Sequence, residues 1–353
     1  MVKALTYRSS AANTVHPSRP ALSSRIKVIL STTSRLLYST SRSSTMQIYN
    51  TVASYRAWRN SLPATSTVGV VPTMGALHAG HLSLARAAAA SNTHVVVTIF
   101  LNPAQFSPTE DLASYPKTMD KDLAALEALN ASLPSSVAGR VTAVFAPTVS
   151  EMYPAGIPLV RDEQVGTFVE VVPLSAKLEG GTRPHFFRGV ATVCTKLFNI
   201  TRPNQVYFGQ KDVQQTVILR RLLRDLHFDI TLTVVPTERE SDGLAMSSRN
   251  VYLSGKRREI AIVLYRGLKR AEELYNNGEG RADLILQAAR EVIEREGEGM
   301  VKLDYVSLNE PELLNEVETV EKGRGVILSA AMWVLPTAEG EGTVRLIDNL
   351  ILQ

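Results

Sequence analysis

Apolar runs and amphipathic stretches alternate along the chain from about residue 46 onward. Short runs rich in β-branched residues predict buried strands at 67–72, 93–103, 141–147, 205–209 and 229–236. Stretches with apolar residues at helical spacing predict helices between these strands, at 81–90, 118–131, 188–203 and 212–227. Strands that are separated by helices indicate a parallel sheet covered on both faces. We therefore expect an α/β fold with a Rossmann-like, doubly wound parallel sheet.

The pattern changes near residue 238. Two amphipathic stretches predict one helix over 255–278 and another over 281–295. Later apolar runs predict the strands 303–308, 325–334 and 343–352. These elements indicate a smaller α+β domain at the C-terminal end. The expected organisation is an N-terminal extension (1–45), a first domain (46–237) and a C-terminal lid domain (238–353).

The N-terminal extension differs in composition from the rest of the chain. Residues 1–45 contain seven Lys or Arg, no Asp or Glu, and many Ser. This composition is typical of a mitochondrial transit peptide. Two alternatives remain open: a disordered tail, or an upstream extension with Met46 as the working start and a cytoplasmic protein. We expect mitochondrial targeting and leave the segment out of fold reasoning.

The basic balance of the chain comes from this extension. The whole chain has 38 Lys plus Arg and 34 Asp plus Glu, and the extension holds seven of the basic residues, which leaves 31 against 34. Global charge therefore does not indicate a nucleic-acid partner. One cysteine excludes an intramolecular disulfide and fits a reducing compartment. No apolar run reaches the length of about 18 residues that a transmembrane helix needs, so we expect no membrane partner.

The stretch PTMGALHAGHLSL (72–84) places two histidines, His78 and His81, in a glycine-bearing loop between a strand and a helix. The free N–H groups of a helix N-terminus favour an anion, and Gly75 and Gly80 permit close approach. A zinc pair and two buried core histidines are the alternatives. Zinc usually needs three or four protein ligands, and few are at hand. Phosphate binding is therefore the favoured interpretation.

Three further polar groups follow predicted strands: Asn102 with Gln105, the segment 208–215, and the segment 241–250. Amides both donate and accept, Lys reaches phosphates as a point charge, and hydroxyls with a guanidinium suit a polyphosphate. Taken singly, each group is better explained as a turn, a helix start or a solvated loop. Their occurrence together, in order, at strand ends favours one site.

The chain from Met46 onward resembles the pantothenate synthetase (pantoate–β-alanine ligase) family, of the nucleotidylyltransferase superfamily. The stretches PTMGALHAGHLSL, FLNPAQF, GQKDVQQ, DGLAMSSRN and the terminal RLIDN carry the resemblance, and the HxGH motif falls on 78–81. The resemblance implies a ligase that joins pantoate to β-alanine through a pantoyl adenylate and releases pyrophosphate and AMP. It also implies Mg²⁺ with ATP, and a homodimer.

The resemblance assigns roles to particular residues. Catalytic roles fall on His81, which the family treats as a proton donor, and on His78, Lys211 and Arg249. ATP contacts fall on Met74, Gly75, Ala76, Leu77, His78, Ala79, Gly80, His81, Gly209, Gln210, Lys211, Asp212, Glu238, Met246, Ser247, Ser248 and Arg249. Pantoate and β-alanine contacts fall on Gln105, Gln215 and Asn102. The magnesium ligands are not assigned; Asp122 is a candidate neighbour, although a solvated helix-face acid is the favoured interpretation of that residue.

The sequence departs from the family pattern at two places. In the stretch RPHFFRGV, His185 stands one position early and Phe186 occupies the expected histidine position, which puts a triphosphate contact by that histidine in doubt. Glu238 replaces a frequent Val at the adenine contact. Three other functions are alternatives: another adenylyl transferase, an aminoacyl-tRNA synthetase fragment and a catalytically silent binding protein. The two glutamines, the charge balance and the intact cationic and imidazole side chains argue against them in turn.

Overall fold

A computed structural model describes residues 46–107 and 112–353, which belong to one compact unit. The targeting segment predicted for 1–45 lies outside the described residues. Within the described ranges no helix has both the length and the apolar character needed to cross a membrane.

The first half of the chain builds a six-stranded sheet in the order β1-β4-β3-β2-β5-β6, in which every neighbouring pair is parallel. This confirms the doubly wound parallel sheet. The edge strand β1 is only three residues long and was not predicted. The strands are β1 (Gln47–Tyr49), β2 (Val68–Thr73), β3 (His94–Ile99), β4 (Arg140–Phe145), β5 (Gln205–Gly209) and β6 (Thr231–Val235).

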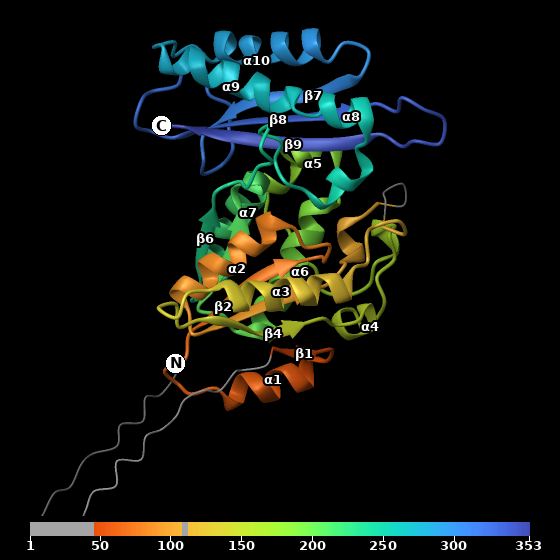
Figure 1. Ribbon diagram of the computed structural model, residues 1–353, viewed down its shortest axis with the longest axis vertical. Coiled ribbons are helices and arrows are strands. Elements are labelled where there is room, and N and C mark those ends of the chain that lie inside the picture. The colour runs from red at the N-terminus through yellow and green to blue at the C-terminus, as the bar shows by residue number, and fades with distance from the viewer. Residues whose placement is uncertain (1–45, 108–111) are drawn as a thin grey trace, which may run out of the picture. The chain divides into compact units, whose positions relative to one another are not determined.

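Helices cover both faces of this sheet (Figure 1). Adjacent residues of β2 point to opposite faces, so Val70 packs in a core with α1, α6 and α7, whereas Val71 packs in a core with α2 and α3. The helices are α1 (Val52–Ser61), α2 (Ala79–Ser91), α3 (Met119–Ser132), α4 (Val149–Met152), α5 (Glu179–Thr182), α6 (Phe186–Thr201) and α7 (Val213–Asp225). Short 3₁₀ turns are η1 (Pro103–Gln105), η2 (Arg161–Glu163), η3 (Leu174–Ala176), η4 (Gln210–Asp212) and η5 (Ser248–Tyr252).

The strand order reverses beside β2. The chain runs from β2 to β3 and β4 on one side, then returns to place β5 on the other side of β2. In open α/β sheets a ligand crevice forms at the carboxyl ends of the strands where the order reverses. The loops that follow β2 and β5 therefore flank the expected crevice.

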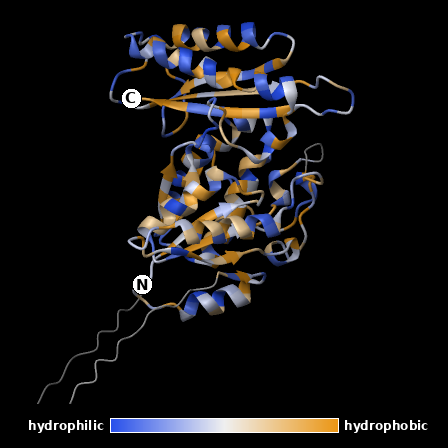
Figure 2. Ribbon diagram, in the orientation of Figure 1, coloured by the Kyte–Doolittle hydropathy of each residue, from blue (hydrophilic) through white to orange (hydrophobic). Residues whose placement is uncertain are grey.

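The last part of the chain forms a three-stranded antiparallel sheet of β7 (Val301–Asn309), β8 (Val326–Val334) and β9 (Val344–Leu352). The helices α9 (Val263–Asn276) and α10 (Ala282–Glu296) pack on it. Both helices alternate hydrophobic and hydrophilic residues around their turns (Figure 2). Buried Leu268, Ala289 and Leu328 belong to their shared core, which confirms an α+β arrangement in this region.

The prediction of one helix over 255–278 is wrong. The helix α8 (Gly255–Ile260) ends before α9 begins, although Ala261 and Ile262 keep right-handed helical dihedrals. The buried Arg257 of α8 donates a 2.6 Å hydrogen bond to the carbonyl of Gly342 in the β8–β9 loop. This contact joins α8 to a loop 85 residues away along the chain, and periodicity cannot reveal it.

The one cysteine, Cys194, lies in α6 and is buried in the core between that helix and the sheet. Burial raises the pKa of its thiol to about 12. The thiol is therefore protonated and packs as a small apolar side chain.

Candidate active site

The loop that follows β2 is held by a buried carboxylate. Asp122 of α3 is 2% exposed; its oxygens accept the N–H groups of Ala76 (3.0 Å) and Leu77 (2.8 Å) and the hydroxyl of Thr118 (3.0 Å). Gly75 and Ala76 both have positive φ, 88° and 52°, which makes the loop a tight turn. The interpretation of Asp122 as a solvated helix-face acid is wrong, because the side chain points inward and fixes the shape of this loop.

The two histidines lie at the start of α2, with ring centroids 4.1 Å apart. Nδ1 of His78 accepts the N–H of Gly80 (3.2 Å), and Nδ1 of His81 accepts the N–H of His78 (3.4 Å). A neutral imidazole that accepts at Nδ1 carries its proton on Nε2. The backbone hydrogen bonds thus assign each ring an Nε2–H donor, and both residues line the cavity.

Both imidazoles are neutral at pH 7. Burial, followed by the charge of Lys211, lowers the pKa of His78 to about 4. Burial, followed by the charges of His78 and Lys211, lowers the pKa of His81 to about 3. Lys211 lines the same cavity as the two histidines. A neutral imidazole donates a hydrogen bond, but it cannot supply a proton as an imidazolium does.

The loop after β5 brings charge and an amide to the same crevice. Lys211 and Asp212 line the cavity, with Nζ and Oδ1 3.6 Å apart. The two adjacent glutamines differ in role. Gln214 is buried and binds backbone groups: its Oε1 accepts the N–H of Glu179 (3.1 Å), and its Nε2 donates to two carbonyls of the preceding segment. Gln215, the one predicted to contact pantoate, has a side chain that is not tied up in this way among the hydrogen bonds described, and it lines the cavity.

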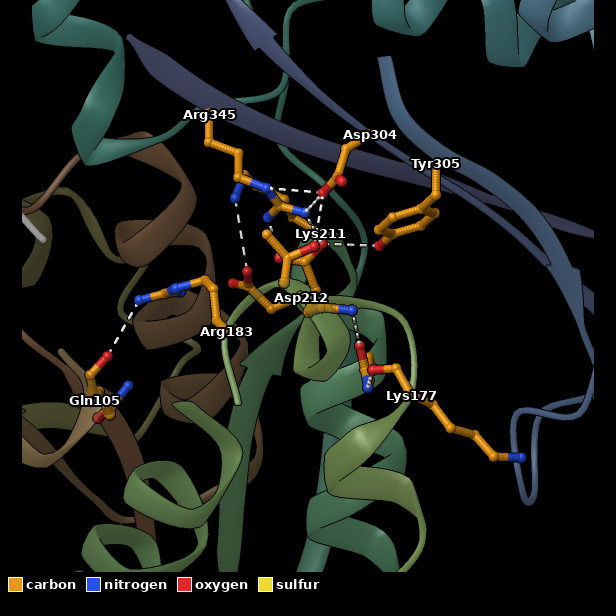
Figure 3. Close-up of polar contacts among 11 residues, drawn as sticks. Gln105, Lys177, Arg183, Lys211, Asp212, Asp304, Tyr305 and Arg345 are labelled. Atoms are coloured by element: carbon orange, nitrogen blue, oxygen red, sulfur yellow. Dashed lines mark hydrogen bonds and ion pairs between the residues drawn. The ribbon is translucent and has the colours of Figure 1, made fainter. Parts of the chain in front are cut away.

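Gln105 is held from both ends after β3. Its Oε1 accepts from Asn102 (2.9 Å), and its carbonyl accepts from Arg183 (3.1 Å; Figure 3). Asn102 is itself bound by the Tyr153 hydroxyl (2.8 Å) and donates to the carbonyl of Gly189 (3.3 Å). Gln105 lines the cavity, whereas Asn102 is not among the lining residues. The structure therefore places Asn102 behind Gln105, where it orients the glutamine.

The segment after β6 closes the other side of the crevice. Glu238 and Ser247 line the cavity together with Met246, Ser248 and Arg249. The Ser248 hydroxyl donates to the carbonyl of Ala76 (3.2 Å), so the segment touches the loop that carries the histidines.

These loops surround one cavity of about 1120 Å³. Of the residues predicted for ATP, pantoate and β-alanine, most line it; the exceptions are Gly75, Ala76, Leu77, Ala79, Gln210 and Asn102. His185 and Phe186 both line it, so the displaced histidine still faces this space. In residues 46–107 and 112–353 no group of three His, Cys, Asp or Glu could hold a metal ion.

Sequence reasoning missed a group of charged and polar residues at the cavity wall. Arg345 of β9 pairs with Glu179 of α5 and with Asp304 of β7, and the Tyr305 hydroxyl donates to Glu179 (2.8 Å; Figure 3). Tyr305 and Glu179 are 126 residues apart along the chain. No local pattern could have indicated the group, although Arg345 stands in the RLIDN stretch that carried part of the resemblance.

A doubly wound sheet with a glycine-bearing loop, two neutral imidazoles and cationic side chains at its switch point defines a nucleotide-using α/β enzyme. The sequence profile of the pantoate-beta-alanine ligase family matches residues 47–351. Pantothenate synthetase of Roseiflexus castenholzii is 47% identical over 308 residues, 87% of this chain and 100% of its own. Pantoate–β-alanine ligase of Saccharomyces cerevisiae is 43% identical over 319 residues, with the same two coverages of 87% and 100%.

Solved structures agree. The crystal structure of pantothenate synthetase from Thermus thermophilus is similar with a TM-score of 0.72 and 40% identity, over 86% of this chain and 99% of that one. The ligase from Francisella tularensis complexed with β-γ ATP and β-alanine has a TM-score of 0.64 and 30% identity, over 87% and 97%. The chain therefore belongs to the pantoate–β-alanine ligase family. It is an enzyme that condenses pantoate with β-alanine in an ATP-dependent reaction.

Proposed function

We propose that the cavity carries out this condensation in two steps. The pantoate carboxylate attacks the α-phosphorus of ATP, a P–O bond forms, and pyrophosphate leaves with the electron pair of the broken bond. The amine of β-alanine then attacks the acyl carbon of pantoyl adenylate, AMP leaves, and the amine loses a proton. A carboxylate is already ionised at pH 7, so the first step needs positioning and charge neutralisation rather than a strong base.

The nucleotide is proposed to lie across the ends of β2 and β5. The histidine loop and the η4 turn would contact its phosphates, with Lys211 as the point charge nearest the imidazoles. Ser247, Ser248 and Arg249 would close over the β- and γ-phosphates. The contact of Ser248 with Ala76 supports this arrangement, because it brings the two segments together near the start of α2.

The observation that carries the proposal is the pair of Nε2–H donors. Two neutral imidazoles with ring centroids 4.1 Å apart, in a cavity that Lys211 also lines, provide donors for the oxygens of a phosphorus centre whose negative charge increases during attack. Their role is electrostatic. His81 acts as a hydrogen-bond donor in this mechanism and not as the proton donor that the resemblance implies.

Pantoate is proposed to bind Gln105 and Gln215. Both amides line the cavity, and Asn102 fixes one of them. Amides match hydroxyls and a carboxylate because they donate and accept.

Mg²⁺ is proposed to arrive with ATP. Mg²⁺ bound to a nucleotide keeps several waters and takes one or two protein carboxylates at most. Asp212 and Glu238, which line the cavity, fit that limited demand. The ion would neutralise phosphate charge there.

A homodimer through the first domain is also proposed. The support for it is the family membership of the chain. Light scattering should give about twice the chain mass of 38.6 kDa.

The test is an omission assay with a matched pair of variants. The purified chain should release pyrophosphate from ATP when pantoate is present and β-alanine is absent, and AMP with pantothenate when both are present. His81→Ala should lower the rate of the first step about 10²–10³-fold while ATP binding weakens only moderately, since the loss of one such donor costs about 2.7–4 kcal/mol. His94→Ala is the control, because His94 is the first residue of β3 and the cavity lies at the carboxyl ends of the strands. Near-normal turnover of His81→Ala, or pyrophosphate release that needs a phosphomonoester instead of pantoate, would contradict the proposal.

A further inference from the structure

We propose that Asn349, in the last strand, is a positioning residue that sets the η4 turn and thereby the place of Lys211 in the cavity. The inference rests on the phosphate-contacting role of Lys211 proposed above.

The Asn349 side chain is committed to this turn. It is 1% exposed, and its Nδ2 donates to the carbonyls of both Gln210 and Lys211, each at 2.9 Å. Its Oδ1 accepts a hydrogen bond from the side-chain Nε2 of Gln210 (3.4 Å). Both amide hydrogens of one buried side chain therefore bind two consecutive carbonyls of a three-residue turn.

The turn has little support of its own. Neither η4 nor the start of α7 has a side-chain cap hydrogen bond. A helix start that lacks a capping side chain leaves its conformation to other contacts. Asn349, 138 residues away from Lys211 along the chain, provides two of them.

The preceding residue performs a parallel task. The Asp348 carboxylate accepts hydrogen bonds from both terminal nitrogens of Arg239, at 2.6 and 2.9 Å. Arg239 also donates to the carbonyl of Gly243 (3.0 Å). Arg239 begins the segment that leads to the serines and arginine of the cavity. Two consecutive residues of β9 thus hold the two phosphate-contacting segments, one each.

The position of Lys211 matters because its charge acts at short range. A shift of the turn therefore alters the ammonium contact with phosphate and the field that this charge exerts on His78 and His81. A displacement of about 1 Å within an active site is enough to reduce a rate on the order of 10²-fold.

The experiment is a double-mutant cycle on the full chain. Asn349→Ala should lower kcat of adenylation on the order of 10-fold or more and leave the KM for β-alanine unchanged. Asn349→Ala combined with Lys211→Ala should be no slower than Lys211→Ala, because a residue that acts through Lys211 has no effect once that side chain is gone. Asn349→Asp keeps the size but loses both donors, so it should fail like Asn349→Ala.

A matched control separates positioning from stability. Asn309 of β7 is also 1% exposed and donates to a backbone carbonyl, that of Leu314 (3.2 Å), away from the cavity wall. Asn309→Ala should lower the melting temperature with kcat retained. If Asn349→Ala does not fold, Asn349→Ser provides the same cycle with a smaller loss.

The outcomes are distinct. Additive effects of Asn349→Ala and Lys211→Ala, or normal kcat in Asn349→Asp, would overturn the inference and leave the proposed function intact. Normal kcat in Lys211→Ala would instead contradict the proposed function.

Discussion

Gly189 of α6 packs directly against the turn that carries Gln105, and enlarging it tests how that glutamine is placed. A Cβ at Gly189 would lie 2.2 Å from the carbonyl oxygen of Ala104 and 2.9 Å from the N–H nitrogen of Gln105. Both neighbours are backbone atoms, so no side chain can rotate away. Gly189→Ala therefore has to separate α6 from η1.

The size of the effect follows from these distances. A carbon and a carbonyl oxygen approach to about 3.3 Å, so the two segments must move apart by about 1 Å. Overpacking of this kind costs on the order of 1–3 kcal/mol of stability. The same shift moves Gln105 and stretches the 3.3 Å hydrogen bond from Asn102 to Gly189, and a misplacement of about 1 Å reduces kcat/KM for pantoate on the order of 10²-fold.

The assay is steady-state kinetics with pantoate and ATP varied in turn, together with thermal unfolding. We expect kcat/KM for pantoate to fall while the KM for ATP stays near normal, because Asp122 of α3, and not α6, holds the histidine loop. Gly181→Ala is the control, since nothing lies within 4 Å of its added methyl group. Normal pantoate kinetics and an unchanged melting temperature in Gly189→Ala would refute this reasoning.

Three further predictions concern other parts of the cavity. Gln105→Ala and Gln215→Ala should raise the KM for pantoate far more than the KM for ATP, and equal effects on both KM values would place these residues outside the pantoate site. Gln214→Ala should mainly lower the melting temperature, because leaving the backbone partners of its buried hydrogen bonds unsatisfied costs about 1–3 kcal/mol. The free energy of unfolding should fall as the pH drops below about 6.5, the ordinary pKa of histidine, because His78 and His81 become protonated there in the unfolded chain but only near pH 4 and 3 in the folded one. Urea unfolding at about pH 7.5 and 5.5 should show a loss of up to about 1.4 kcal/mol per histidine. The double variant His78→Gln, His81→Gln should remove this pH dependence. Arg249→Ala should weaken ATP use and release more than one AMP per pantothenate, because an open site lets the adenylate hydrolyse; a ratio that stays at one with normal ATP dependence would contradict the lid role.

Strand and helix periodicity predicted most of the six-stranded sheet and its helices because each element has its own local signal. The strand predicted at 67–72 and the helix predicted at 81–90 agree with β2 (Val68–Thr73) and α2 (Ala79–Ser91) to within two residues at each end. What failed was decided by contacts between distant residues. The helix α8 is tied to the distant Gly342 through Arg257, which no local pattern shows, and β1 is too short to show a period.

The candidate site shows the same division. Motifs located the cavity residues of the loops, since each motif is contiguous. They could not tell that the Gln214 side chain is bound to backbone groups whereas that of Gln215 is not among the hydrogen bonds described, or that Asp122 turns inward to hold Ala76 and Leu77. Support from Asn349 and the pairing of Arg345 with Glu179 were equally invisible, because the partners stand 139 and 166 positions apart.

Cys194 can report on the opening of α6, the helix that packs against the Gln105 turn. The thiol lies on α6, the same helix that supports the Gln105 turn, and it is the single cysteine of the sequence. A thiol reagent reaches it only when α6 separates from the sheet, so the labelling rate follows that opening event. Pantoate bound to Gln105 should slow the modification of the thiol. The rate of labelling with and without pantoate therefore measures how far substrate binding stabilises α6 against opening.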